Sequence, residues 1–79
     1  MSKVITPYGK GVEICVSWQR ASGNEIPHGA VRAGGRCYVA RALHDNEYIP
    51  GKVVEGFNGA YVCYGGKEYN KPQYEVITF

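Results

Sequence analysis

The chain has 79 residues, a formal net charge of +2, and nine basic side chains scattered among seven acidic ones. This charge pattern argues against nucleic acid as a partner, because phosphate binding calls for a basic stripe. So short a chain buries only about 60% of its unfolded surface, which predicts a single domain over residues 1–79 with a thin core.

The three cysteines, Cys15, Cys37 and Cys63, are odd in number and contain no C-x-x-C pair. This disfavours a structural zinc site or a complete set of intrachain disulfides, and we expect Cys37 and Cys63 to be small core residues. No apolar run is long enough to cross a bilayer, and the start does not resemble a secretory signal. We therefore expect no membrane insertion and a cytoplasmic chain with reduced thiols, with extracellular release left open.

The first predicted element is a half-buried strand over residues 12–19. Its apolar positions alternate with polar ones and place four side chains on one face: Val12, Ile14, Val16 and Trp18. Turn formers at 21–25 and the following Ile26-Pro27 predict a loop. Residues 37–42 predict the next strand, with Ala40 and Ala42 on one face, and a turn follows at 44–47.

The second half of the chain continues the same pattern. Residues 48–54 and 60–64 predict strands, the second closed by Gly65-Gly66, and the polar stretch 67–72 predicts a loop. A last strand follows at 74–79. Because no segment has a helical period, we expect an all-β domain, a small antiparallel sheet of about six short strands.

The chain also looks like one unit written twice. Ile26-Pro27 recurs as Ile49-Pro50, and Val31, Tyr38 and Val39 then fall opposite Val54, Tyr61 and Val62.

The edges of such a sheet call for a partner. Residues 74–79 are apolar on alternate positions of both faces, which predicts burial on both sides. We expect a second identical chain to complete the sheet, as a two-fold homodimer or a higher homo-oligomer.

No catalytic set can be assembled from these residues. His28 and His44 lie in polar segments outside any catalytic or metal-binding spacing, so we expect solvated loop histidines. Gly65-Gly66-Lys67 lacks the remaining glycines and the hydroxyl residue of a phosphate loop. We expect neither an enzyme nor a bound cofactor or metal.

The ligand-binding candidates are polar residues fixed by turns, in a chain with seven tyrosines and one tryptophan. Lys52 follows Pro50-Gly51, and Glu47, five residues earlier, is expected near it, so that an amine and an acid bracket a vicinal diol. The alternative is an exposed turn pair with a weak ion pair. Lys67 and Glu68 follow the glycine pair and offer a donor and an acceptor on a shallow surface, as sugar sites do.

Several motifs in order resemble one repeat of the DM-nine family, the lectin-like module also found in natterin-type proteins. The stretches that carry the resemblance are WQRASGNEIPHGAV at 18–31, YVARA at 38–42, IPGKV at 49–53, AYV at 60–62, YGGKE at 64–68 and YEV at 74–76.

The resemblance implies a β-rich fold in which paired repeats complete each other, so a homodimer of this single repeat would stand in for the tandem pair. It also implies a mannose-binding lectin of innate immunity, with Lys52 and Glu47 contacting the sugar. The loop at 31–36 lacks the acid used in the family, and Arg36 is expected in its place. The alternative is a structural or protein-interaction module that keeps the fold without binding sugar. The pore-forming segment of natterin-type toxins has no counterpart here.

Overall fold

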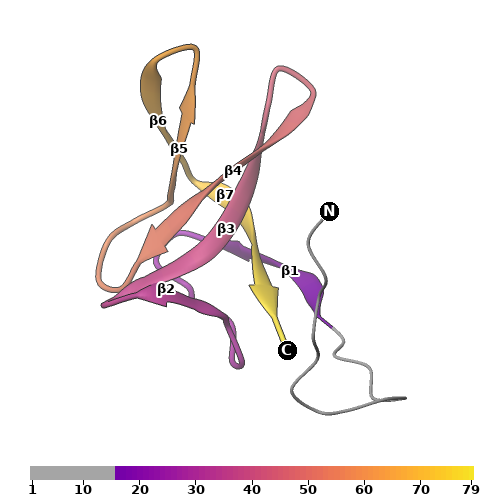
Figure 1. Ribbon diagram of the computed structural model, residues 1–79, viewed down its shortest axis with the longest axis vertical. Coiled ribbons are helices and arrows are strands. Elements are labelled where there is room, and N and C mark those ends of the chain that lie inside the picture. The colour runs from indigo at the N-terminus through magenta and orange to yellow at the C-terminus, as the bar shows by residue number, and fades with distance from the viewer. Residues whose placement is uncertain (1–15) are drawn as a thin grey trace, which may run out of the picture.

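The computed structural model describes residues 16–79, and within them the fold is all-β and antiparallel, as predicted (Figure 1). Seven strands are present rather than about six. They are β1 (Ser17–Ser22), β2 (Arg32–Gly34), β3 (Cys37–His44), β4 (Glu47–Val54), β5 (Ala60–Tyr64), β6 (Lys67–Lys71) and β7 (Gln73–Thr78).

The strands form one twisted sheet in the order β1-β7-β3-β4-β5-β6, with β2 paired to β3. Hairpins account for β3–β4 and β5–β6, and the free ends of these hairpins project to the same side of the molecule (Figure 1). The last strand does not extend the sheet at an edge. It inserts between β1 and β3, which joins the N-terminal part of the described chain to the central hairpin.

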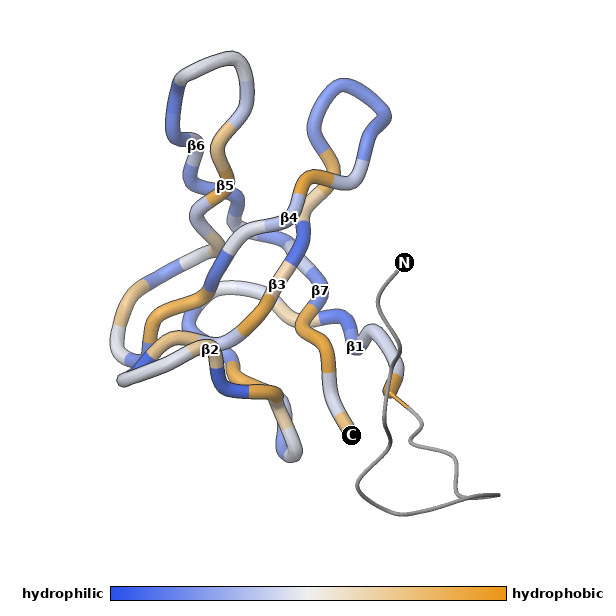
Figure 2. The backbone as a smooth tube through the Cα atoms, in the orientation of Figure 1, coloured by the Kyte–Doolittle hydropathy of each residue, from blue (hydrophilic) through white to orange (hydrophobic). Residues whose placement is uncertain are grey.

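Tight turns build both hairpins. Asp45 and Asn46 join β3 to β4 with φ of 50° and 64°, and Gly65 and Gly66 join β5 to β6 with φ of 60° and 79°. Two residues with positive φ form the turn whose twist matches that of the flanking strands. The backbone at the tip of the β3–β4 hairpin is hydrophilic, whereas the middle of β3 is more hydrophobic (Figure 2).

The core lies on one face of the sheet, called here the inner face. It is made by seven buried side chains: Ala40, Ala42, Val53, Ala60, Val62, Tyr74 and Val76. The largest fully buried ones are only Val62 and Val76, so the predicted thin core is confirmed. The opposite face, the outer face, carries the side chains that alternate with these, including Arg41, Tyr48 and Lys52.

Three predictions about the elements are wrong: one strand was missed, one loop start was misplaced, and one strand face is not buried. The predicted loop at 67–72 contains β6, because the Gly65-Gly66 turn folds this polar stretch back onto β5. The loop predicted at 21–25 starts two residues later than predicted, at residue 23, since Ala21 and Ser22 pair with β7 and belong to β1. Trp18 and Val16 expose 36% and 48% of their surface, so the face they share is not half-buried; Val12 and Ile14 lie outside the described residues.

The internal repeat is not reproduced. Ile49-Pro50 lies in the middle of β4, paired with Ala42 and Arg41, whereas Ile26-Pro27 lies in the loop after β1. The two segments share a sequence pattern and adopt different structures, because the second lies within a strand that pairs with β3 and, from Gly51 onward, with β5, whereas the first lies in a loop.

The last strand is buried mainly on one face. Tyr74, Val76 and Thr78 are buried, whereas Phe79, predicted to be covered, exposes 76% of its surface. Cys63 is exposed and Cys37 half-buried, so the expectation of two core thiols is wrong for Cys63; Cys15 lies outside the described part of the chain.

Candidate functional site

A row of three charged residues crosses the outer face of the sheet. Because β7 lies between β1 and β3, Glu75 is directly opposite Arg20 on one side and Arg41 on the other. Directly opposed residues of an antiparallel pair lie on the same face with Cβ atoms about 5 Å apart. The insertion of β7 therefore lines up a carboxylate between two guanidinium groups.

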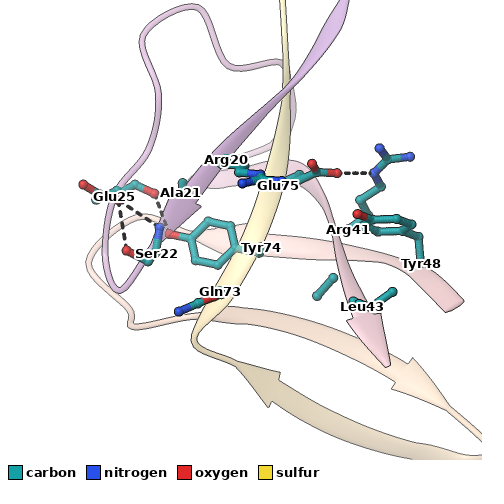
Figure 3. A pocket seen from close by; sticks show the side chains of 11 residues that line it. Arg20, Ala21, Ser22, Glu25, Arg41, Leu43, Tyr48, Gln73, Tyr74 and Glu75 are labelled. Carbon is teal, nitrogen blue, oxygen red and sulfur yellow. Dashed lines mark hydrogen bonds and ion pairs between the residues drawn. The ribbon is translucent and has the colours of Figure 1, made fainter. Parts of the chain in front are cut away.

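Arg41 is held on three sides. Its Nε donates a hydrogen bond of 2.7 Å to Oε1 of Glu75 (Figure 3). Its guanidinium carbon also lies 4.2 Å from the ring centroid of Trp18 and 4.3 Å from that of Tyr48. Two such cation–π contacts together stabilise this position by roughly 1–2 kcal/mol. The Nε bond leaves the two Nη groups as donors at a fixed place on the surface.

An open groove of about 520 Å³ adjoins this stack (Figure 3). It is bounded by β1, β7, β3 and β4. Its lining residues are Arg20, Ala21, Ser22, Glu25, Arg41, Ala42, Leu43, Tyr48, Gln73, Tyr74 and Glu75.

The far end of the groove is organised by Tyr74. Its hydroxyl lies 2.6 Å from the carbonyl oxygen of Glu25 and 3.1 Å from that of Gly23. The Glu25 carboxylate in turn accepts a hydrogen bond of 2.9 Å from the Ser22 backbone N–H. Burial, and secondarily the charge of Glu25, raises the pKa of Tyr74 above its ordinary value of 10.0. The tyrosine is therefore a neutral donor that fixes the loop.

A second hollow of about 590 Å³ lies between β1 and the loop at 25–28. Among the described residues, no Trp, Tyr or Phe lines it. Its lining mixes apolar residues with polar and charged ones: Gln19, Arg20, Ala21, Glu25, Ile26, Pro27, His28 and Thr78. The groove beside Arg41 is the better-built site, because it combines fixed donors, a fixed acceptor and an aromatic wall.

The structure separates the predicted pair of Lys52 and Glu47. Both belong to β4, but they are five residues apart, so their side chains leave opposite faces about 16 Å from each other along the strand. Lys52 lies on the outer face opposite Tyr61, and Glu47 lies on the inner face opposite His44. The expected proximity of this acid and amine is wrong.

The other predicted site residues are also dispersed. Lys67 and Glu68 begin β6, where Lys67 shares the inner face with Tyr64 and Glu68 pairs with Cys63 on the outer face. Arg36 lies in the turn before β3, at the opposite end of that strand from Glu47, and its carbonyl oxygen accepts a bond of 2.9 Å from the Glu55 N–H. Neither hollow includes any of the five predicted residues in its lining.

His44 is not the solvated loop residue that the sequence predicted. Its ring lies 4.9 Å from that of Tyr64 and 4.4 Å from that of Tyr69, and its side chain is only 14% exposed. This inner-face cluster connects the ends of the two hairpins. Its function is packing, since three rings in contact replace the apolar side chains that the core lacks there.

Residues 33–79 match a family model described as the DM9 repeat. The chain belongs to the DM9 repeat family. This confirms the resemblance to the DM-nine family seen in the motifs, and it makes the chain a lectin-like module. No curated protein matches the chain.

The DM9 match covers Arg41, Tyr48 and Glu75 but begins after Trp18. Sequence reasoning missed these four residues as a group, because Glu75 is 34 positions from Arg41 and meets it only through the insertion of β7. One signal was available: Arg41 interrupts a strand of small and apolar residues, and a charge in such a place usually has a partner.

Within residues 16–79, no group of three or more histidine, cysteine, aspartate or glutamate side chains is placed to hold a metal ion. In the same part of the chain, no helix is long and apolar enough to span a membrane.

Proposed function

We propose that this DM9 chain is a non-catalytic carbohydrate-binding protein for mannose-type glycans, and that the outer-face groove is its contact surface. The observation that carries the proposal is the Arg41 guanidinium, stacked between Trp18 and Tyr48 and bonded to Glu75 at the edge of an open groove. Family membership supports the carbohydrate class. The preference for mannose rests on the resemblance to the mannose-binding members.

The chemistry of the groove suits a polyhydroxy ligand. Vicinal hydroxyls need a donor and an acceptor side by side, and the Nη groups of Arg41 and the carboxylate of Glu75 provide both. The Tyr48 ring adds a flat surface for the apolar face of a sugar. Because the stack and the ion pair hold these groups in place before binding, little side-chain entropy is lost when a ligand arrives.

Isothermal titration of mannose and methyl α-mannoside tests this proposal. We expect Tyr48→Ala to weaken binding at least tenfold, because it removes one wall of the stack while Tyr48 itself, 52% exposed, contributes little to the core. Glu47→Gln is the matched control, since Glu47 is the neighbouring residue on β4 and faces the other side of the sheet. Weaker binding in Glu47→Gln with no change in Tyr48→Ala would place the site on the inner face and contradict the proposal.

We propose further that the protein acts as a homodimer, so that two shallow sites engage one multivalent glycan. The support is the contrast between the two sheet edges. Lysines at both ends of β6 protect one edge, whereas β1 exposes Trp18 at the other, next to Val16. Light scattering coupled to size exclusion tests this: we expect twice the chain mass, and a stable monomer at micromolar concentration would contradict it.

The exposed Val16 and Trp18 also favour a second candidate function, a module that binds another protein along the β1 edge. A thermal shift with monosaccharides distinguishes the two, because a ligand that binds only the folded state raises the midpoint. If no monosaccharide raises the melting midpoint, and the calorimetric titrations with mannose and methyl α-mannoside show no binding, the protein-binding module is favoured.

A further inference from the structure

Arg20 is a charged residue of the outer-face groove that the proposed sugar contact leaves unused. It lies on β1 directly opposite Glu75, so its side chain emerges on the outer face next to that carboxylate (Figure 3). Arg20 lines both the groove beside Arg41 and the second hollow. A ligand bound in either of them can therefore reach its guanidinium group.

The carboxylate nearest to Arg20 is already paired. Oε1 of Glu75 accepts the 2.7 Å hydrogen bond from Nε of Arg41, and the Glu75 side chain is only 17% exposed. Within residues 16–79 two ion pairs are recorded, Arg41–Glu75 and His44–Asp45, and neither includes Arg20. In the same part of the chain, no recorded side-chain hydrogen bond involves the Arg20 guanidinium.

The other acid of the groove, Glu25, is also bonded elsewhere. Its Oε1 accepts hydrogen bonds of 2.9 Å from the Ser22 N–H and 3.3 Å from the Ser22 hydroxyl, which hold this carboxylate at the end of β1. Among the described residues, no ion pair joins Glu25 to Arg20. The positive charge of Arg20 is therefore left in the groove for a ligand to neutralise.

The sheet sets the distance from Arg20 to the proposed sugar contact. Arg20, Glu75 and Arg41 form one row across β1, β7 and β3. Adjacent strands lie about 4.8 Å apart, so the backbones at Arg20 and Arg41 are about 10 Å apart, with Glu75 midway. A sugar ring whose hydroxyls contact Arg41 and Glu75 can therefore direct a substituent toward Arg20.

A guanidinium group without a protein partner favours an anion as its ligand. Its planar fork of N–H donors matches the paired oxygens of a carboxylate or a phosphate, and the resulting hydrogen bonds are charge-assisted. Such bonds are roughly twice as strong as those between neutral groups. The hydroxyl groups of a neutral sugar cannot provide this pairing.

We infer that Arg20 forms an anion subsite of the outer-face groove, and that the preferred ligand is a mannose-type sugar carrying an anionic substituent rather than neutral mannose. This inference rests on the proposed function. Arg41, Glu75 and Tyr48 contact the sugar ring, and Arg20 binds the substituent. A carboxylate and a phosphate share this chemistry, and the ligands of the test distinguish them.

Isothermal titration with mannose, mannose 6-phosphate and mannuronic acid tests the inference. The quantity to compare is the ratio of the affinity for each acidic sugar to the affinity for mannose. We expect at least one ratio to be about ten or more at roughly 0.05 M salt, because a charge-assisted bond is added, and to fall at roughly 0.5 M salt, because salt screens an exposed ion pair. The acidic sugar with the higher ratio identifies the substituent as a phosphate or a carboxylate.

Arg20→Gln should bring the ratio down to about one, whatever the affinity of the variant for mannose, because the amide keeps a hydrogen-bond donor and removes the charge. Arg20 is exposed, so this substitution leaves the core intact. Arg32→Gln is the matched control: it removes the same charge from an exposed arginine on β2, opposite Tyr38, that lines neither hollow. It should leave the ratio unchanged.

Ratios near one in the unmodified protein, with mannose itself bound, would overturn the inference and leave the proposed function standing. A high ratio that survives in Arg20→Gln would also overturn it, because the anion would then bind elsewhere. An equal fall of the ratio in Arg20→Gln and Arg32→Gln would overturn it in favour of an effect of net charge. An absence of binding by all three sugars would overturn the inference together with the proposed function.

Discussion

Removing the hydroxyl of Tyr74 should loosen the loop that closes the groove. Tyr74 is a buried core residue on β7 whose hydroxyl reaches the carbonyl oxygens of Glu25 and Gly23. The Gly23 oxygen also accepts a bond of 2.7 Å from the Gly59 N–H, so it keeps a partner in Tyr74→Phe. The Glu25 oxygen loses the donor that lies 2.6 Å away.

The expected loss of unfolding free energy in Tyr74→Phe follows from these two carbonyl contacts. One lost hydrogen bond and one acceptor left without its donor correspond to about 1–2 kcal/mol of unfolding free energy. For a domain of this size, that lowers the melting midpoint by roughly 5–15 °C. Urea unfolding followed by far-UV circular dichroism measures it, with Tyr48→Phe as the matched control, since the Tyr48 side chain lies half exposed on the outer face.

The difference in unfolding free energy between the unmodified protein and Tyr74→Phe should also depend on pH. Because the pKa of Tyr74 in the folded state is raised above 10.0, the folded protein holds this proton more tightly than the unfolded chain. The stability it contributes is complete below pH 10 and is lost as pH rises through 10 toward the folded value. The gap between the unmodified protein and Tyr74→Phe should therefore narrow above pH 10. A difference in unfolding free energy smaller than about 0.5 kcal/mol at pH 7, or a difference that grows at alkaline pH, would refute the reasoning.

Three further substitutions test the fold around the groove by urea unfolding. Gly51→Ala should cost about 1–3 kcal/mol, because the new Cβ meets the backbone carbonyl of Tyr61, and a change below 0.5 kcal/mol would show that β4 can shift. Arg41→Met should cost roughly 1–3 kcal/mol of unfolding free energy, because it leaves the mostly buried carboxylate of Glu75 without its partner. Adding Glu75→Gln to Arg41→Met should restore part of that loss. If the effects of the two substitutions simply add, the two residues are not coupled and the described pair is contradicted. Asn46→Ala should cost about 1 kcal/mol and Asn46→Gly nothing, because φ at this position is 64°; equal stability of the two variants would be inconsistent with the turn described.

Local alternation was enough to predict the strands that carry the core. In β3 the period of two places Ala40 and Ala42 on the inner face, and β5 begins and ends at the predicted residues. The β6 strand was missed because its sequence, KEYNK, is polar and lacks alternation, and its pairing depends on the Gly65-Gly66 turn rather than on burial. Such a strand is stabilised by its neighbour and not by its own composition.

The site was harder to predict than the fold, for a physical reason. The positions of Lys52 and Glu47 depend on the parity of a strand: once Pro50 and Gly51 are inside β4 rather than in a turn, residues five apart face opposite sides. The contact of Arg41 with Glu75 depends on which strand β7 joins, and that is a property of the whole sheet. Neither fact is encoded in a short stretch of sequence.

The central claim is that the outer-face groove beside the Arg41 stack is a carbohydrate-binding surface. Backbone amide chemical shifts of the ¹⁵N-labelled protein, recorded during a titration with mannotriose, test it most directly. We predict saturable shifts at residues 39–43, 48–52 and 73–76, with little change at residues 65–69. Shifts confined to the inner-face cluster of His44, Tyr64 and Tyr69, or no saturable shift at any concentration of the sugar, would contradict the claim.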